Sequence, residues 1–287
     1  MSAASRPLLR VLHLRGLPIF DQLRYEEVLL RHTPHNWLVL NTGVAQTSVV
    51  LGMSGNVSEL VDLERAAADS VPMIRRYTGG GTVVVDASTV FVSFIMNEKD
   101  ADCRPYPREI MDWSARAVYA PLFNKCASVG ASSSSGNGSK NAFALREHDY
   151  VFGEMKFAGN AQSITKGRWV HHTSFLWDFN PHNMAYLKMP KKRPDYRGDR
   201  DHAKFLTTLK EVLPSVEAFF GGLSEAAGAH YAVELAEEPI GLIVSAALQR
   251  CGKELAHVAR TQLEDVHRHH SLSKMGLVRT GPSCVNL

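Results

Sequence analysis

The sequence has few cysteines and no long apolar run. Its 287 residues include four cysteines, which form no CxxC pair and no Cys/His ladder: Cys103, Cys126, Cys251 and Cys284. This arrangement argues against a zinc site and favours a reduced intracellular protein. No apolar stretch approaches the ~20 residues that a membrane-spanning helix needs, so we expect no membrane partner.

The sequence also lacks an excess of one charge. It contains 32 lysines and arginines against 29 aspartates and glutamates, whereas a nucleic-acid-binding protein usually has a stronger basic excess. We therefore expect no nucleic-acid partner. One basic cluster is present, KMPKKRPDYRGDR at 188–200. It is either a solvated loop or a docking patch for an acidic ligand or partner.

The N-terminal segment is basic and has no acidic residue before Asp21. This is a weak feature of a mitochondrial presequence. Residues 9–14 read as the first strand of the fold, so only about eight residues remain for targeting. We expect a mitochondrial or cytoplasmic protein without a clear presequence.

Strand-like and helix-like patterns are mixed along the chain without strict alternation, which predicts an α+β fold. Helical spacing of apolar residues indicates helices at 18–32, 57–70 (capped by Ser58) and 107–123, and a mainly helical region after about 200. Short β-branched runs predict strands at 9–14, 36–43, 47–53, 71–77, 82–96, 150–164 and 168–179, with 36–43 paired to 47–53. The Ser/Gly/Asn tract 131–141 cannot bury enough apolar area to order itself, so we expect a disordered insertion.

Three consecutive glycines follow a double arginine in RRYTGGGTVVVD, residues 75–86. Glycines tolerate positive φ and expose their amides, which can cradle an anion. Strand alternation points one of Arg75 and Arg76 inward, where it can bind phosphate or carboxylate with two hydrogen bonds. The alternative is a plain hairpin with solvent-facing arginines. The spacing matches neither a P-loop nor a dinucleotide fingerprint.

A single lysine interrupts an apolar stretch in FGEMKFAGNAQS, residues 152–163. Lys156 either extends past its apolar neighbours to water or points into a pocket. In a pocket its ammonium would neutralise a carboxylate and a phosphate as they react. The small residues Gly159, Asn160 and Ala161 would let a ligand approach the backbone.

Together the two stretches resemble the motifs of the lipoate–protein ligase family. RRYTGGGTVVVD resembles its RRxSGGGxVxHD motif, and KFAGNAQ…HHTS resembles its K(V/I)(A/S)G(S/N)A…HHG(T/S) block. Within the family, the likeness is strong to a eukaryotic branch of biotin/lipoate A/B protein ligase-like proteins. The resemblance implies a class II biotin/lipoyl ligase-like catalytic domain of mixed and antiparallel sheets with packed helices over residues 1–215. A helical extension, 216–287, would pack on the same domain.

The family resemblance implies an ATP-dependent ligase. Lipoic acid and ATP, with Mg²⁺, would give lipoyl-AMP and pyrophosphate. The lipoyl group would then pass to a lysine on a lipoyl carrier domain of a 2-oxoacid dehydrogenase complex, or on the glycine cleavage H protein. The enzyme would contribute mainly positioning and charge stabilisation.

The resemblance also implies which residues form the site. It implies no metal ion bound by the protein itself. Lys156 matches the catalytic lysine that bridges acyl carboxylate and phosphate. Arg76 matches the arginine that contacts the adenylate. The remaining matches to substrate- or adenylate-binding positions are Thr78, Gly79, Gly80, Gly81, Val83, Asp86, Gly159, Ala161, His172 and Ser174.

Three positions depart from the family pattern. Val85 replaces a histidine and Thr89 an asparagine, both expected on the nucleotide side, and Thr173 replaces the glycine after His172. If the loop serves a nucleotide, Val85→His is expected to tighten ATP binding. Two alternatives to a ligase stay open: an ATP-independent lipoyl or octanoyl transferase, and a non-catalytic acyl-binding relative. A cysteine-nucleophile transferase is disfavoured, because no cysteine lies between Cys126 and Cys251.

Overall fold

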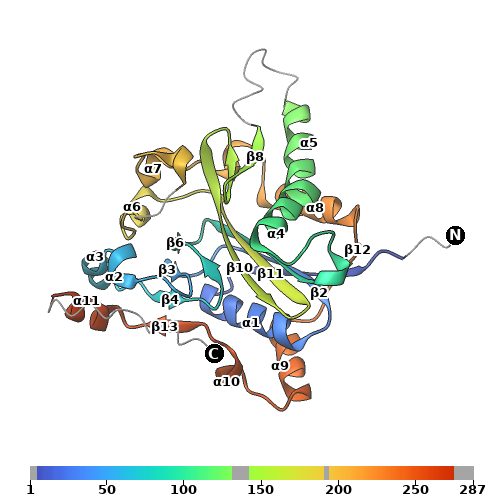
Figure 1. Cartoon of the computed structure of the whole chain (residues 1–287), viewed down its shortest axis with the longest axis horizontal. Helices are drawn as coiled ribbons and strands as arrows, with labels where there is room; N and C mark the ends of the chain where they lie inside the picture. Colours follow the sequence, from blue (N-terminus) through green and yellow to red (C-terminus); the bar gives the residue numbers. More distant parts are fainter. Residues whose placement is uncertain (1–4, 131–141, 191–193, 275–287) are drawn as a thin grey trace.

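Two β-sheets carry the fold in the computed structural model of the chain, which describes residues 5–130, 142–190 and 194–274. Helices cover both faces of the larger sheet, and the smaller sheet lies beside it (Figure 1). The predicted α+β class is confirmed. The expected disordered insertion, 131–141, lies outside the described residues.

The larger sheet has parallel and antiparallel parts. Its first three strands are parallel to one another, and the others are antiparallel. The order is β12 (Ala232–Leu235), β1 (Leu8–Arg15), β2 (Asn36–Thr42), β7 (Thr89–Asn97), β11 (Arg168–Leu176), β10 (Met155–Thr165), β9 (Asp149–Phe152) and β8 (Phe143–Arg146). β7 is central and nearly all its side chains are buried, because both faces of the sheet are covered.

The smaller sheet has the order β13 (Gln262–Glu264), β4 (Met73–Arg75), β3 (Ser48–Leu51) and β6 (Val83–Val85). The predicted pairing of 36–43 with 47–53 is therefore wrong, since β2 and β3 belong to different sheets. Between them Gly43 has φ +71° and packs against the backbone of Ala87, where an added Cβ would lie 2.6 Å from the carbonyl oxygen. This close crossing takes the chain from one sheet to the other instead of closing a hairpin.

Two helix layers enclose the larger sheet (Figure 1). On one face lie α1 (Ile19–His32) and α9 (Ile240–Arg250). On the other lie α4 (Pro107–Ser114), a π-helical turn (Ala115–Tyr119), α5 (Ala120–Gly130) and α8 (Val216–Gly228). Among the described residues, no helix combines the length and the hydropathy needed to cross a bilayer.

Shorter helices flank the smaller sheet and the chain ends: α2 (Val57–Leu60), α3 (Leu63–Ala68), α6 (Pro181–Met184), α7 (His202–Phe205), α10 (Leu255–Val258) and α11 (Val266–Lys274). The single helix expected at 57–70 with a Ser58 cap is wrong. Asn56 and Asp62 cap two separate helices, because their side chains accept hydrogen bonds from the amides of Ser58 and Arg65.

The region after residue 215 is more than a helical extension. It adds β12 to the edge of the larger sheet and β13 to the edge of the smaller one. Neither strand was expected from the sequence. The domain boundary at residue 215 stays a prediction.

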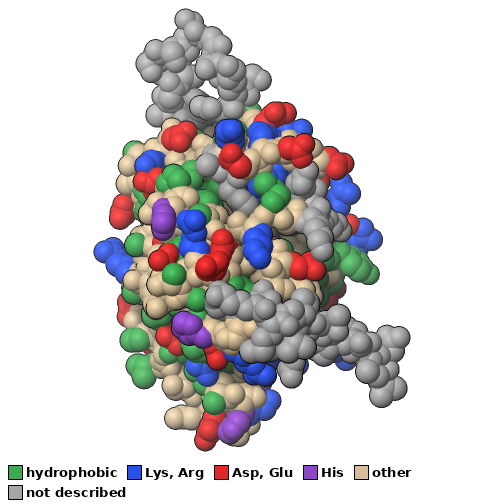
Figure 2. All heavy atoms as spheres, turned by 90° about the vertical axis from the view of Figure 1, so that its left-hand side faces the viewer, with side chains coloured by type: hydrophobic (Ala, Val, Ile, Leu, Met, Phe, Trp, Pro, Cys, Tyr) green, Lys and Arg blue, Asp and Glu red, His purple; other side chains and the backbone are tan. Residues whose placement is uncertain are grey.

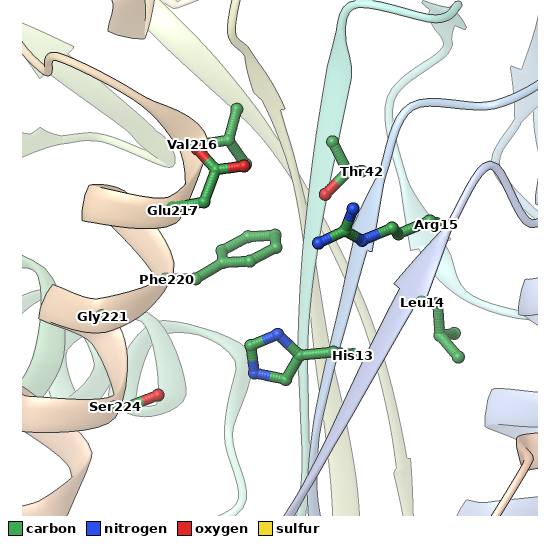
Figure 3. Close-up of a pocket in the computed structure, with 9 residues that line it drawn as sticks. All are labelled: His13, Leu14, Arg15, Thr42, Val216, Glu217, Phe220, Gly221 and Ser224. Atoms are coloured by element: carbon green, nitrogen blue, oxygen red, sulfur yellow. The ribbon is translucent and has the colours of Figure 1, made fainter.

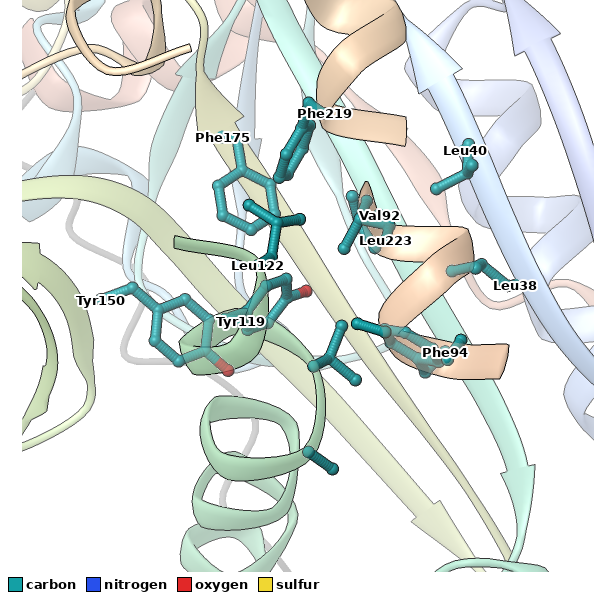
Figure 4. Close-up of a cluster of buried hydrophobic side chains, with 14 of the residues drawn as sticks. Leu38, Leu40, Val92, Phe94, Tyr119, Leu122, Tyr150, Phe175, Phe219 and Leu223 are labelled. Carbon is teal, nitrogen blue, oxygen red and sulfur yellow. The ribbon is translucent and has the colours of Figure 1, made fainter. Parts of the chain in front are cut away.

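Aromatic side chains fill the core on the α8 side of the larger sheet (Figure 4). Phe175 lies at the centre of this cluster and is fully buried. Its ring centroid is 5.3 Å from that of Tyr119 and 5.0 Å from that of Phe219. The aromatic packing fixes the positions of β10 and β11, which carry residues of the predicted site.

A chain of buried polar groups adjoins this core. The side-chain amide of Gln162 donates to Pro107 O and lies 3.0 Å from His171 Nδ1, so Nδ1 is the acceptor. The proton of the neutral ring is then on Nε2, which lies 2.8 Å from the Tyr150 hydroxyl; that hydroxyl is 2.6 Å from Ser114 Oγ. Burial, together with the charge of neighbouring His172, lowers the pKa of His171 to about 3.

His171 should make the protein sensitive to acid. Its pKa when folded lies below its ordinary value of 6.5. As the pH falls below that value the unfolded chain takes up the proton first, and stability is lost. We expect His171→Gln to flatten the fall in unfolding free energy between pH 6.5 and 4 by up to about 1.4 kcal/mol per pH unit. Urea unfolding at several pH values measures this, and equal slopes in the two proteins would contradict it.

Candidate functional site

The glycine triplet forms a close crossing between the two sheets. β5 (Gly79–Gly80) pairs with Gln162 and Ala161 of β10, and the chain then continues into β6. Gly80 has φ +117°, and a Cβ there would lie 2.6 Å from Asn160 O and 2.8 Å from an Arg76 nitrogen. Only glycine fits this position.

Arg76 points inward at the base of the loop. Its side chain is 4% exposed, and its guanidinium donates to the carbonyl oxygens of Gly81 (2.7 Å), Val50 (3.3 Å) and Gly79 (3.4 Å). Burial lowers its pKa to about 10, so it is still charged at neutral pH. No carboxylate of the described chain pairs with it. Arg75 has the opposite orientation and forms an ion pair with Glu264, as strand alternation predicts.

Several buried donors of residues 76–82 have no partner within the described residues. They are Arg76 Nε and the hydroxyl groups of Tyr77, Thr78 and Thr82. Leaving a buried donor unsatisfied costs about 1–3 kcal/mol. Together with the uncompensated guanidinium, these donors fit an anionic ligand at the glycine loop.

A β-bulge sets the direction of Lys156. The register of β10 against β9 shifts between Lys156 and Ala158. Residues three apart on a regular strand face opposite sides, but the extra residue brings Lys156 to the face shared by Gly159 and Ala161. The bulge therefore aligns the lysine with the small residues of the motif.

Lys156 is not surrounded by apolar groups alone. Its ammonium lies 2.6 Å from the Asp149 carboxylate, which also accepts a 2.8 Å hydrogen bond from the Tyr196 hydroxyl. Sequence reasoning missed Asp149 because the contact depends on the register of the β9–β10 hairpin. The spacing of two strands around the turn at Gly153 was the signal that could have revealed it.

Small side chains separate the two sheets beside Lys156. Gly159 and Ala161 of β10 pair with Ser174 and His172 of the neighbouring strand β11. A Cβ at Gly159 would lie 3.2 Å from both Ser174 Oγ and Val83 Cγ1. Gly159, Ala161, His172, Ser174 and Val83 therefore form one largely buried strip between β6 and the larger sheet.

A buried carboxylate of α1 holds His172. Its Nδ1 lies 3.0 Å from Glu26 Oε2 and 2.8 Å from Ser93 Oγ. Burial acts to raise the pKa of Glu26, but the His172 charge and hydrogen bonds from His172, Gln22 and Ser93 outweigh it and hold that pKa below its usual value. The sequence gives no sign that Glu26 is buried, since it stands beside Glu27 in a charged helix.

The two departures near the nucleotide side have structural roles. Asp86 accepts hydrogen bonds from Ser88 through one carboxylate oxygen and from Asn183 through the other. Thr89 Oγ1 accepts from the Asp86 amide and closes the same turn. Val85 is 1% exposed and packs in the apolar cluster that contains Phe91.

The predicted residues therefore fall into two groups. Those near the glycine loop and the strip come together, whereas Asp86 lies in the β6–β7 turn. In the described part of the chain no three His, Cys, Asp or Glu side chains gather as a metal site.

The described part of the basic cluster at 188–200 includes arginines that pack on the protein. Arg197 and Arg200 lie over the Phe205 ring at 4.8 and 5.3 Å, and Arg197 is 5% exposed. Shortly after this segment, the Thr207 amide donates a hydrogen bond to Lys156 O, which ties the chain to β10. On the face that carries α2, α3, α6 and α7, basic and acidic side chains are intermingled (Figure 2).

A cleft of about 360 Å³ lies away from these residues, between the end of β1 and α8 (Figure 3). His13, Arg15, Thr42, Glu217 and Phe220 are among its lining residues. His13 follows Leu9 and Val11 on the α8 side of the sheet, opposite the strip. No sequence-predicted site residue lines this cleft.

Val85→His should destabilise the protein, contrary to the expectation from the sequence. The valine side chain faces the core, so an imidazole there would be buried without a partner. We expect a loss of about 1–3 kcal/mol in unfolding free energy. Urea unfolding tests this, with Val85→Ile as an apolar control. A stable histidine variant that binds ATP more tightly would restore the original expectation.

Comparisons with known proteins identify the family of the chain. The model of the lipoyl protein ligase A/B catalytic domain matches residues 18–226. The chain is 30% identical over 185 residues to the inactive lipoate–protein ligase 2 of Plasmodium falciparum (isolate 3D7). That match covers 58% of this chain and 48% of the relative, so the chain spans about half the length of the Plasmodium protein.

Solved structures show the same fold. Lipoate-protein ligase A bound with ATP superposes with a TM-score of 0.60 at 19% identity, covering 88% of this chain and 96% of that one. P. falciparum LipL1 in complex with lipoate gives 0.58 at 18%, covering 83% and 70%. A bipartite ligase of Thermoplasma acidophilum, described with its E2 lipoyl domain, gives 0.57 at 19%, covering 98% and 100%. Because the family model covers most of its length, the chain belongs to the lipoyl protein ligase A/B catalytic-domain family.

Proposed function

We propose that the chain is an ATP-dependent lipoate–protein ligase. The observation that carries this proposal is the buried, uncompensated guanidinium of Arg76 at the base of the glycine loop. A buried cation without a carboxylate is costly, and an anionic ligand would compensate it. The phosphate of an acyl-adenylate is such a ligand.

The proposed reaction has two steps. A lipoate carboxylate oxygen attacks the α-phosphorus of ATP, which arrives with Mg²⁺, and pyrophosphate leaves. The amine of a carrier lysine then attacks the lipoyl carbonyl carbon, and AMP leaves as the amide forms. In both steps Arg76 and Lys156 would stabilise negative charge near the phosphate, which is how fixed cations lower such barriers.

The strip between the sheets suits the acyl chain. Gly159 and Ala161 leave its floor without bulky side chains, and Val83 adds an apolar wall. His172, held by Glu26, can present its other ring nitrogen to the ligand. The acceptor would be a lipoyl carrier domain of a 2-oxoacid dehydrogenase complex or the glycine cleavage H protein. The association of the T. acidophilum ligase with an E2 lipoyl domain supports this choice.

A second candidate is an ATP-independent lipoyl or octanoyl transferase, or an acyl-binding relative without catalysis. The apolar packing of Val85 and the use of Asp86 and Thr89 in a turn favour it. The inactive designation of the Plasmodium relative points the same way. Such a protein would need the acyl strip and one phosphate contact, but none for the β- and γ-phosphates.

Pyrophosphate release separates these functions. Purified protein is incubated with MgATP and with lipoate, octanoate or biotin in turn. The ligase proposal predicts release with lipoate or octanoate and none with biotin. If no acid supports release, but synthetic lipoyl-AMP is transferred to a carrier domain, the protein is a transferase.

Lys156→Ala should abolish adenylate formation while the protein stays folded. Removing the ammonium takes away charge stabilisation next to the reacting phosphate, and we expect a loss of about a hundredfold or more. Lys166→Ala, in the exposed β10–β11 turn, is the matched control. Pyrophosphate release at the wild-type rate in Lys156→Ala would exclude Lys156 from the reaction.

Arg76→Met separates binding from folding. Replacing a buried ion pair by apolar side chains is often neutral or stabilising by about 1–4 kcal/mol, and an unpaired buried cation has no ion-pair attraction to lose. We expect the melting temperature of the free variant to be maintained or raised. Millimolar pyrophosphate or AMP should raise the melting temperature of the wild type but not that of the variant. A large loss of stability in the ligand-free variant would instead make Arg76 a structural residue.

A further inference from the structure

The C-terminal strand β13 contacts the strand that leads into the glycine loop. It runs antiparallel to β4, with Gln262 opposite Arg75 and Glu264 opposite Met73. The Glu264 carboxylate forms an ion pair with Arg75 Nε, and the two side chains are 12% and 20% exposed. This contact joins residues 189 positions apart in the sequence.

Arg75 also holds the turn that follows β3. Its Nη1 donates to Gly55 O at 2.8 Å and lies 3.3 Å from the carbonyl oxygens of Gly52 and Met53. Three carbonyl oxygens around one nitrogen fix the turn, because each of them loses a donor if the guanidinium moves. Glu264 in turn fixes the direction of that guanidinium.

The same turn abuts the glycine loop. The Met53 amide donates to Thr78 O at 3.1 Å. A Cβ on Gly52 would lie 2.2 Å from Gly80 O and 3.5 Å from an Arg76 nitrogen. The contact is so close that a displacement of the turn must displace the loop or the arginine.

We propose that Glu264 is a positioning residue for the glycine loop: it holds Arg75, and Arg75 holds the 52–55 turn against Thr78 and Gly80. The C-terminal segment is then part of the site's support. Its consequence for catalysis rests on the ligase function proposed above, whereas the mechanical link does not.

Two further contacts anchor Glu264. Its second carboxylate oxygen lies 2.7 Å from His269 Nε2, on α11. Val266, at the start of that helix, packs in the apolar cluster with Val57, Leu63 and Met73. Partial burial acts to raise the pKa of Glu264, but hydrogen bonds from His269 and Arg75 and their charges hold it below its usual value. The carboxylate is therefore ionised at neutral pH.

Hydrogen exchange tests the link without any activity. The Met53 amide is protected by its hydrogen bond to Thr78 O, and the Gly55 amide by its hydrogen bond to Gly52 O. In Glu264→Gln and Glu264→Ala we expect them to exchange about tenfold faster, because the turn opens locally. Leu263→Ala is the matched control, since it changes a 60% exposed side chain on the same strand. Unchanged exchange at Met53 and Gly55 in both folded Glu264 variants would overturn the proposal.

Activity provides the second measurement. If the link matters for catalysis, Glu264→Gln should lower kcat/KM for pyrophosphate release about tenfold or more, since small displacements of a site have large effects on rate. Its melting temperature should fall no further than that of Leu263→Ala. A wild type that releases no pyrophosphate would refute the ligase function and leave the exchange result decisive for Glu264. Faster exchange with unchanged kcat/KM would refute the role of Glu264 in the reaction.

Discussion

The buried guanidinium of Arg76 is the constraint around which the two sheets are arranged. It donates hydrogen bonds to carbonyl oxygens of β3 and of the glycine loop, and together with Asn160 O it leaves no room for a side chain at Gly80. Those carbonyls are poor substitutes for an anion, because they carry no net charge. Under the proposed function this cation binds an anionic ligand, which offsets the cost of burying the guanidinium.

The two faces of the larger sheet differ in the side chains that they carry. On the α8 side, aromatic rings fill the core. The side chains of His171, Tyr150 and Ser114 lie among them and are hydrogen-bonded to one another. On the opposite side, the strip of Gly159, Ala161 and Ser174 keeps side chains small beside Lys156. One bulge in β10 connects the two arrangements, because it places Lys156 on the face of the strip while Phe157 stays in the aromatic core.

Local patterns in the sequence were sufficient for much of the fold. The strand at 9–14, the helix at 18–32 and a positive φ within the glycine triplet, at Gly80, each follow from spacing or backbone chemistry, and the structure confirms them. Contacts between distant segments were not predictable in this way. Asp149 meets Lys156 through a hairpin register, Glu26 meets His172 through helix packing, and β13 reaches β4 from the far end of the chain. Val85 shows the same limit, since its alignment with a family histidine did not reveal that it faces the core.

The most direct test of the account is calorimetric titration with a stable lipoyl-adenylate analogue, compared with lipoate alone. If Arg76 and Lys156 form an anion site next to an acyl strip, the analogue should bind at about micromolar Kd or tighter. It should also bind at least about a hundredfold more tightly than lipoate, which corresponds to ~2.7 kcal/mol. Equal affinities for the two ligands would contradict the account, because they would show that the glycine loop and its buried arginine contribute nothing to recognition of the phosphate.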